Sequence, residues 1–198
     1  PFDEQCADLL ESLDVAAFKI PSGEITNLPY LSHIAKKQRP IILSTGMATL
    51  EEVGDAVATV RAEGNERLVV LHCVSNYPAD AWEANLRAMA TLADFCKTPI
   101  GFSDHTAGID ISIAAVALGA CLIEKHFTTD RSLEGPDHLA SLEPDELTEM
   151  VRALRRVESA LGDGLKRVMP GELETRAVAR KSLVAARDLP AATVLSRE

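Results

Sequence analysis

Two histidines that stand close to carboxylates are the side chains of this sequence best suited to chemistry. His105 follows the short apolar run 99–103, and His126 lies in the run 122–127, two residues after Glu124. Imidazoles on neighbouring segments suit a first-row divalent metal, with further coordination positions left to water or substrate. Two histidines without a fixed local spacing are a weak signal alone, but their matching positions at two successive segment ends favour a metal site.

Polar side chains also stand where three earlier apolar runs end. A lysine, several hydroxyl groups and glycine-flanked backbone amides gathered in one place would form a pocket for a phosphate group. The residues at all of these ends are Lys19, Ser22, Glu24, Ser44, Thr45, Ser75, Asn76, Tyr77, Ser103, Asp104, His105, Glu124, Lys125, His126 and Asp137. The other two nearby histidines fit different roles, because His33 lies in a lysine-containing helical stretch and His72 lies inside an apolar run.

The elements that must position these side chains alternate strictly between strands and helices. Their strands are short and apolar on both faces, which is typical of a parallel sheet covered by helices. Strands are predicted over 15–20, 41–45, 68–74, 99–103 and 122–127. Helices are predicted over 3–13, 28–37, 49–63, 83–96, 109–118 and 144–161, with Asn27 and the Thr49-x-x-Glu52 box as N-terminal caps.

This alternation predicts an α/β fold of the (β/α)8 TIM-barrel type, because the strand ends recur at the roughly 30-residue interval of such barrels. A doubly wound sheet is the rival; no Gly-x-Gly-x-x-Gly follows the first strand, and polar residues stand at every strand end. Residues 1–164 would supply the last five units, and about three more, roughly 90 residues, are expected before Pro1. Residues 165–180 are predicted to be a linker, and 181–186 to be a strand that opens a truncated second domain over 181–198.

Composition narrows the classes of partner. The net charge of −10 over 198 residues argues against nucleic acid. No apolar run approaches the ~20 residues of a membrane span, so we expect no membrane partner. The first residues show no signal region and no initiator Met, so we expect the sequence to be part of a longer chain. The scattered cysteines favour a cytoplasmic protein. Cys6, Cys73, Cys96 and Cys121 form no CxxC pair and are predicted to be buried, reduced thiols.

Six short runs stand in order at the predicted strand ends: Phe18-Lys-Ile-Pro-Ser-Gly-Glu24, Ile42-Leu-Ser-Thr-Gly-Met47, Leu71-His-Cys-Val-Ser-Asn-Tyr-Pro78, Gly101-Phe-Ser-Asp-His-Thr106, Glu124-Lys-His-Phe127 and Gly135-Pro-Asp-His138. Together they resemble the sialic acid synthase family, the N-acetylneuraminate synthases with their legionaminate and spore-coat relatives. The resemblance implies a barrel followed by an antifreeze-like (SAF) domain. It also implies condensation of phosphoenolpyruvate with an N-acetylated hexosamine, N-acetylmannosamine or a diacetamido analogue, to give a nonulosonic (sialic) acid and phosphate.

The resemblance further implies a role for each matching residue. The residues expected to hold phosphoenolpyruvate are Lys19, Ser22, Ser44, Ser75 and Ser103. Those expected to contact the sugar are Glu24, Tyr77 and Asp137. A Mn²⁺ or Mg²⁺ ion is expected on His105 and His126, and the catalytic groups would be Glu124, as acid or base, and Lys19. Family members suggest a homodimer in which the C-terminal domain of one chain covers the barrel of the other.

Two other functions remain open for the same residues. A Schiff-base aldolase of the same fold would use Lys19 or Lys125 as its nucleophile and would need no metal. A non-catalytic module would bind a phosphorylated ligand or a partner without turnover. The family also uses residues of early strands that precede the matched runs, so we expect residues 1–198 alone to be inactive.

Overall fold

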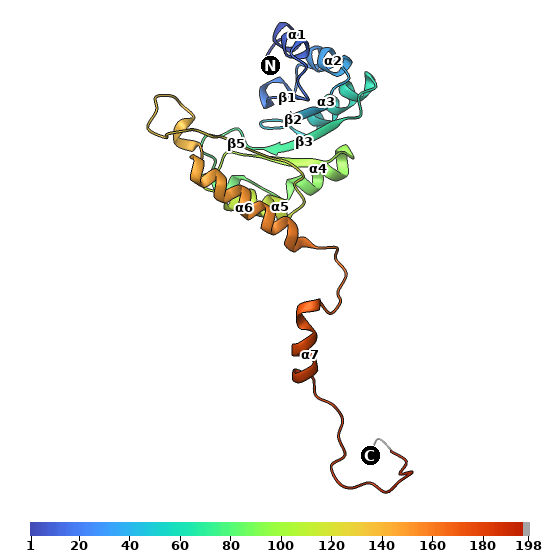
Figure 1. Ribbon diagram of the computed structural model, residues 1–198. Coiled ribbons are helices and arrows are strands. Elements are labelled where there is room, and N and C mark those ends of the chain that lie inside the picture. Colours follow the sequence, from blue (N-terminus) through green and yellow to red (C-terminus); the bar gives the residue numbers. More distant parts are fainter. Residues whose placement is uncertain (196–198) are drawn as a thin grey trace. The chain divides into compact units, whose positions relative to one another are not determined.

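The computed structural model describes residues 1–195, which fall into two units, Pro1–Gly162 and a second unit that begins at Asp163. The first unit is built on a parallel sheet in which each strand pairs with the next strand of the sequence (Figure 1). Its strands are β1 (Phe18–Ile20), β2 (Ile41–Ser44), β3 (Leu68–Cys73), β4 (Ile100–Asp104) and β5 (Ile123–Lys125). The five parallel strands form a half-barrel, which confirms the predicted fold class.

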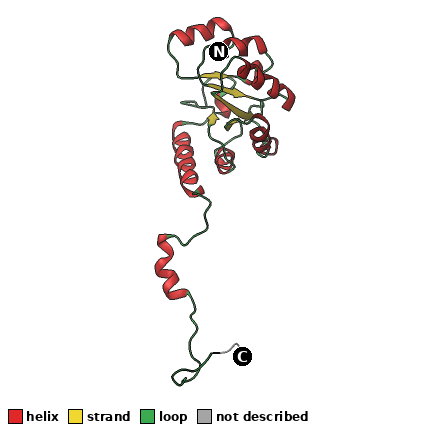
Figure 2. Ribbon diagram, turned by 90° about the vertical axis from the view of Figure 1, so that its right-hand side faces the viewer, coloured by secondary structure: helices red, strands yellow, loops and turns green. Residues whose placement is uncertain are grey.

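Helices separate the strands and lie along the outer side of the curved sheet (Figure 2). They are α1 (Glu4–Ser12), α2 (Leu28–Lys36), α3 (Leu50–Ala62), α4 (Ala88–Cys96), α5 (Asp110–Ala117) and α6 (Pro144–Leu161). The predicted capping box starts α3, because the Thr49 hydroxyl accepts the amide of Glu52 and the Glu52 carboxylate accepts the amide of Thr49. The helix predicted from residue 83 begins only at Ala88, since a 3-10 turn (Ala81–Glu83) and a positive φ at Asn85 interrupt it.

The core lies between the sheet and these helices. Alternate residues of each strand point toward the helices and form one half of the core, including the fully buried Phe18, Leu43 and Phe102. Helix residues such as Leu31 and Val53 supply the other half. Because side chains alternate across a strand, the residues between the core positions of each strand face the inner side of the half-barrel.

The second unit contains a 3-10 turn (Pro170–Glu172) and helix α7 (Leu173–Ala179), so the predicted linker over 165–180 is partly helical. The strand predicted over 181–186 is wrong, since these residues are exposed and hold no strand. A strand needs a neighbour for its backbone hydrogen bonds, and the described residues offer none there. Residues 196–198 lie outside the described residues, and the assignment of 181–198 to an antifreeze-like domain stays a prediction.

The described residues bear on two further expectations, which concern membrane-spanning helices and the state of the cysteines. None of their helices is both long and apolar enough to cross a lipid bilayer. Their cysteines are all free, as predicted, and Cys73 and Cys96 are buried. The prediction of burial is wrong for Cys6 and Cys121, which are exposed because one lies on a surface helix and the other just before the edge strand β5.

Candidate functional site

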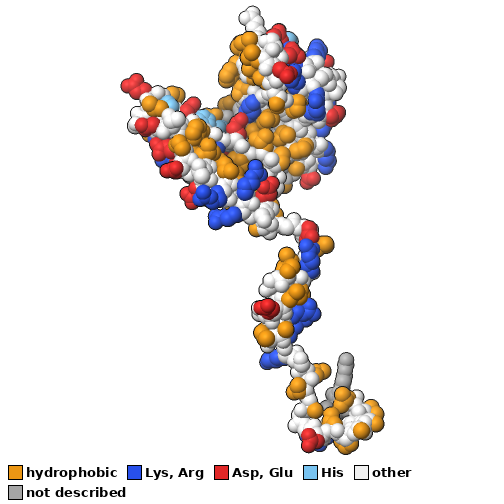
Figure 3. Space-filling model, viewed as in Figure 1, with side chains coloured by type: hydrophobic (Ala, Val, Ile, Leu, Met, Phe, Trp, Pro, Cys, Tyr) orange, Lys and Arg blue, Asp and Glu red, His pale blue; other side chains and the backbone are white. Residues whose placement is uncertain are grey.

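The inner face of the half-barrel collects the polar ends of its strands. Phe18 and Ile20 are buried against the helices, so Lys19 between them faces inward. The register of the sheet sets Cys73 beside Ser103, and Ser103 beside Glu124. Figure 3 shows histidine and acidic side chains meeting at a hollow on the face in view. The predicted catalytic and phosphate-binding residues therefore share one face.

Glu124 is held by groups from two other strands. Its Oε1 lies 3.4 Å from the Nζ of Lys19 and accepts a hydrogen bond of 2.8 Å from the Ser103 hydroxyl. Because β1 and β5 are the two edge strands of the half-barrel, the ion pair spans its inner side. Both side chains are about one-third exposed, so the pair contributes only about 0–1 kcal/mol to stability. Its main effect is to fix the orientation of the carboxylate.

A cluster of small polar side chains, which we call the serine cluster, surrounds Gly46. It consists of Ser22, Gly46, Cys73 and Ser75. The Gly46 amide donates to the Ser22 hydroxyl at 2.9 Å, and a Cβ at Gly46 would lie 2.1 Å from the Ser75 Oγ. Only glycine fits there, and it leaves the hydroxyl groups and a backbone amide around one small space.

Two hydroxyl groups of this region lack partners. Among the described residues, the buried hydroxyls of Ser44 and Ser75 make no hydrogen bond. A buried polar group without a partner costs about 1–3 kcal/mol and is uncommon in folded proteins. The arrangement fits an anionic ligand, whose oxygens would accept both hydroxyl protons.

The two histidines come together at the ends of β4 and β5. Their ring centroids are 5.2 Å apart, and the ring of Tyr77 packs against His105 at 4.2 Å and His126 at 5.5 Å. The Nδ1 of His105 donates to the Val74 carbonyl at 2.7 Å, since that carbonyl can only accept. This bond orients the ring as in many metal sites, and Nε2 is the atom that would coordinate a metal ion. The Nδ1 of His126 lies 4.0 Å from the Asp137 carboxylate.

The pair fits a divalent metal only as a partial ligand set. The described residues contain no group of three or more histidine, cysteine or carboxylate side chains arranged to hold a metal ion. Imidazole ligands favour Zn²⁺, whereas Mn²⁺ prefers oxygen ligands. In a Mn²⁺ site, the coordination positions not taken by the two histidines would have to be filled by oxygen atoms. The two imidazoles thus lie close together, while the metal site itself and the choice of metal stay predictions.

Opposite pKa shifts distinguish the two imidazoles. Burial disfavours protonation of His105, but its contacts with Cys73 and Val74 and the charge of Glu124 outweigh burial and raise its pKa. Burial and the neighbouring His105 lower the pKa of His126. Burial would raise the pKa of Cys73, but hydrogen bonds with His105 and Ser22 lower it overall.

Cys73 is a functional candidate that sequence reasoning missed. Its Sγ lies 3.6 Å from the Ser22 hydroxyl and 3.8 Å from the Nδ1 of His105, so it joins the serine cluster to the histidine pair. The alternation of side chains along β3 could have identified it, because Cys73 lies on the same face as Leu71 and opposite to the core residue His72. His72 is a satisfied core histidine, as predicted, and bonds to the Ala84 carbonyl through Nε2 at 2.8 Å.

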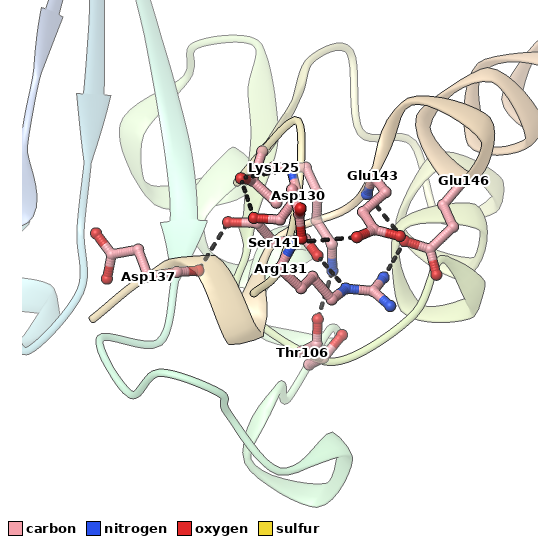
Figure 4. Close-up of polar contacts among 9 residues, drawn as sticks. Thr106, Lys125, Asp130, Arg131, Asp137, Ser141, Glu143 and Glu146 are labelled. Atoms are coloured by element: carbon pink, nitrogen blue, oxygen red, sulfur yellow. Dashed lines mark hydrogen bonds and ion pairs between the residues drawn. The ribbon is translucent and has the colours of Figure 1, made fainter. Parts of the chain in front are cut away.

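Asp104 and Lys125, by contrast, face away from the inner side. Lys125 Nζ lies 3.0 Å from Asp104 Oδ2, with side-chain exposures of 2% and 0%. Asp104 also accepts bonds from the Thr106 amide and hydroxyl and from the Ser112 hydroxyl. Lys125 also donates to the Thr106 carbonyl (Figure 4). Lys125 as a Schiff-base nucleophile is therefore wrong, because it is paired and points into the helix layer.

The residues predicted to contact the sugar are only partly assembled. Tyr77 and Asp137 both lie beside His126, and their side chains are about half exposed. The Glu24 carboxylate instead accepts a 2.8 Å hydrogen bond from the side chain of Asn27, the cap of α2. The structure thus groups two of the three around the histidine pair.

Comparison with known proteins places these features in a family. The model described as NeuB family matches residues 1–166. Two N,N′-diacetyllegionaminic acid synthases, from Legionella pneumophila and Campylobacter jejuni, are 52% and 51% identical over 100% and 99% of the chain. The chain spans 56% and 59% of their lengths. The crystal structure of an N-acetylneuraminic acid (sialic acid) synthetase from Leptospira borgpetersenii, in complex with citrate, matches with a TM-score of 0.82 and 39% identity, over 91% of this chain and 65% of that one.

Proposed function

Because the chain belongs to the NeuB family, we propose that the protein condenses phosphoenolpyruvate with an N-acetylated hexosamine, giving a nonulosonic acid and phosphate. The observation that carries this proposal is the shared inner face, where Cys73 joins the serine cluster to His105 and stands beside Ser103, which donates to Glu124. The names of the two legionaminic acid synthases described above favour a diacetamido hexose over N-acetylmannosamine as the sugar.

Phosphoenolpyruvate is the anion that this inner face would receive. The residues proposed to hold it are Lys19, Ser22, Ser44, Ser75 and Ser103. The unpartnered hydroxyls of Ser44 and Ser75 supply donors that are already desolvated. Such preorganised donors and one lysine offset the ligand's charge without reorganisation, in a protein of net charge −10.

Glu124 is proposed as the acid or base. A divalent ion, Mn²⁺ or Mg²⁺, held by His105 and His126 would supply a Lewis acid for the negative charge that develops on the sugar aldehyde oxygen. Lys19 and Ser103 hold the Glu124 carboxylate in one orientation, from which it can exchange a proton with that oxygen or with attacking water. Tyr77 and Asp137 are proposed to contact the sugar beside the same histidines.

The alternatives are less well supported by the same contacts. A Schiff base on Lys19 needs an amine that is free to attack a carbonyl, whereas its Nζ lies 3.4 Å from the Glu124 carboxylate. A non-catalytic module gives no reason for an oriented carboxylate next to two imidazoles. We retain the predictions of a homodimer and of a cytoplasmic location.

The test is phosphate release from phosphoenolpyruvate by the full-length protein. We would supply N-acetylmannosamine or its diacetamido analogue, with Mn²⁺ or with EDTA. We expect release that needs sugar and metal and that is lost in His126→Ala, while His33→Ala, a substitution on the surface of α2, keeps it. If phosphoenolpyruvate binds but no phosphate is released with either sugar, the binding module is favoured. If phosphate release resists EDTA and borohydride traps the carbonyl substrate on the protein, the aldolase is favoured.

A further inference from the structure

The loop between β5 and α6, residues 127–143, closes on itself beside the histidine pair. At its base the Leu142 amide donates to the His126 carbonyl, and the Thr128 amide donates to the Leu142 carbonyl, both at 2.9 Å. Phe127 and Leu142 form an isolated parallel bridge. Thr128 and Leu142 are buried, so this base is protected from water. The loop therefore returns to the residue that would bind the metal.

Bonds inside the loop fix its far side. The Thr128 hydroxyl is 2.8 Å from the Nδ1 of His138, and the Ser141 hydroxyl donates to the Asp137 carbonyl at 2.7 Å. The Ser141 amide donates to the His138 carbonyl at 3.1 Å. These bonds hold the backbone of Asp137, whereas its side chain is 58% exposed. The carboxylate is thus open to a ligand although its backbone is constrained.

Arg131 ties this loop to the first turn of α6 (Figure 4). Its Nε donates to the Ser141 carbonyl at 2.9 Å, and its guanidinium forms an ion pair with Glu146. Its backbone amide donates to the Glu143 carboxylate at 3.0 Å. Glu146 also accepts the Glu143 amide in the box that caps α6. One planar side chain thus engages both the loop and the helix, a geometry that lysine cannot reproduce.

We propose that Arg131 is a positioning residue for binding of the sugar, which holds the 127–143 loop on α6 and so keeps the Asp137 carboxylate beside His126. This inference rests on the proposed function, because the ligand assigned to Asp137 is the N-acetylated hexosamine. The bond from Ser141 to Asp137 transmits the constraint, since Arg131 holds the carbonyl of the same Ser141. Loss of Arg131 leaves the buried base of the loop intact and frees its far side.

The expected signature is a selective effect on the sugar. In the full-length protein, Arg131→Gln and Arg131→Lys should raise KM for the sugar on the order of 10- to 100-fold, as for other residues that orient ligand-binding groups. KM for phosphoenolpyruvate and the affinity for Mn²⁺ should stay within about twofold of wild type, the scatter expected for a distant surface change. Hydrogen exchange should quicken across 130–141 and stay slow in β4.

Two matched variants keep the test sharp. Glu146→Gln retains an acceptor for the cap of α6 but removes the charge that Arg131 meets, so it should shift KM for the sugar in the same direction. Arg155→Gln removes an exposed arginine of α6 that pairs with Glu158 at 2.8 Å, and it should change nothing. Combining Arg131→Gln with Asp137→Asn should add little to Asp137→Asn alone, because both act through one carboxylate.

The outcomes separate this inference from the function on which it rests. No sugar-dependent consumption of phosphoenolpyruvate by the wild type would refute the proposed function and this inference with it. A wild type that turns over while Arg131→Gln keeps the wild-type KM for the sugar would overturn the positioning role alone. Equal losses for sugar, phosphoenolpyruvate and Mn²⁺ would also overturn it, since they indicate a general structural role.

Discussion

Removing one partner of the buried pair Asp104–Lys125 should destabilise the protein strongly and unequally. Both side chains are almost fully buried, and an uncompensated buried charge costs about 3–5 kcal/mol. After Lys125→Met, Asp104 keeps three hydrogen bonds, from Thr106 and Ser112, so we expect about 3 kcal/mol. After Asp104→Ala, Lys125 keeps only the Thr106 carbonyl among the described residues, so we expect about 5 kcal/mol.

Urea unfolding followed by circular dichroism measures these losses, provided that the m-value stays constant across the variants. The control is Lys97→Met, because Lys97 is exposed and pairs at 3.7 Å with an exposed Asp94; it should change stability by less than about 0.5 kcal/mol. The double variant should be more stable than the sum of the single losses predicts. A loss below about 1 kcal/mol for Lys125→Met, or additivity in the double variant, would refute the reasoning.

Three further predictions concern the inner face and the core. Gly46→Ala should weaken phosphoenolpyruvate binding by one to two orders of magnitude in calorimetry, because the new methyl group overpacks the serine cluster at a cost of about 1–3 kcal/mol. The control is Gly23→Ala, where a Cβ meets nothing within 4 Å. Equal affinities of the two variants for phosphoenolpyruvate would count against the serine cluster as the binding site. His126→Gln should abolish the bound Mn²⁺ signal in electron paramagnetic resonance, and a retained signal would exclude this residue as a ligand. Burial lowers the pKa of His72 in the folded protein below the value of about 6.5 that a histidine has in the unfolded chain. At a pH just below 6.5 the unfolded state therefore binds more protons than the folded state, and the free energy of unfolding should fall as the pH drops through this value. In His72→Gln this part of the pH dependence should disappear from urea titrations, and an unchanged slope would show that His72 does not cause it.

The strand ends could be predicted because parallel strands bring them to one edge, and this was enough to gather Lys19, Ser103, Glu124 and the histidine pair. The prediction ignored that successive side chains at each strand end point to opposite faces of the sheet. Asp104 immediately precedes His105 and therefore faces the opposite side of the sheet. The same rule separates Lys125 from its neighbours on either side.

Other features depend on contacts that a local pattern does not contain. Cys73 is a buried, free thiol, as predicted, but its place between a hydroxyl and an imidazole depends on contacts with two other strand ends. Arg131 stands in a loop without periodicity, so its bonds to Ser141 and Glu146 leave no trace in the sequence pattern. The apolar pattern over 181–186 indicated a strand, but a strand forms only beside a partner.

The order of the strands in space bears on how the protein is made. Each strand pairs with the strand that follows it in the chain, so every pairing closes one of the shortest crossovers that a parallel sheet permits. Short closures reduce the entropic barrier and favour rapid folding. During synthesis, each new strand and helix can dock on the previous unit as it leaves the ribosome. Glu124 of β5 then meets Lys19 of β1 only after the strands between them have been made, so this ion pair forms late in the assembly of the described sheet.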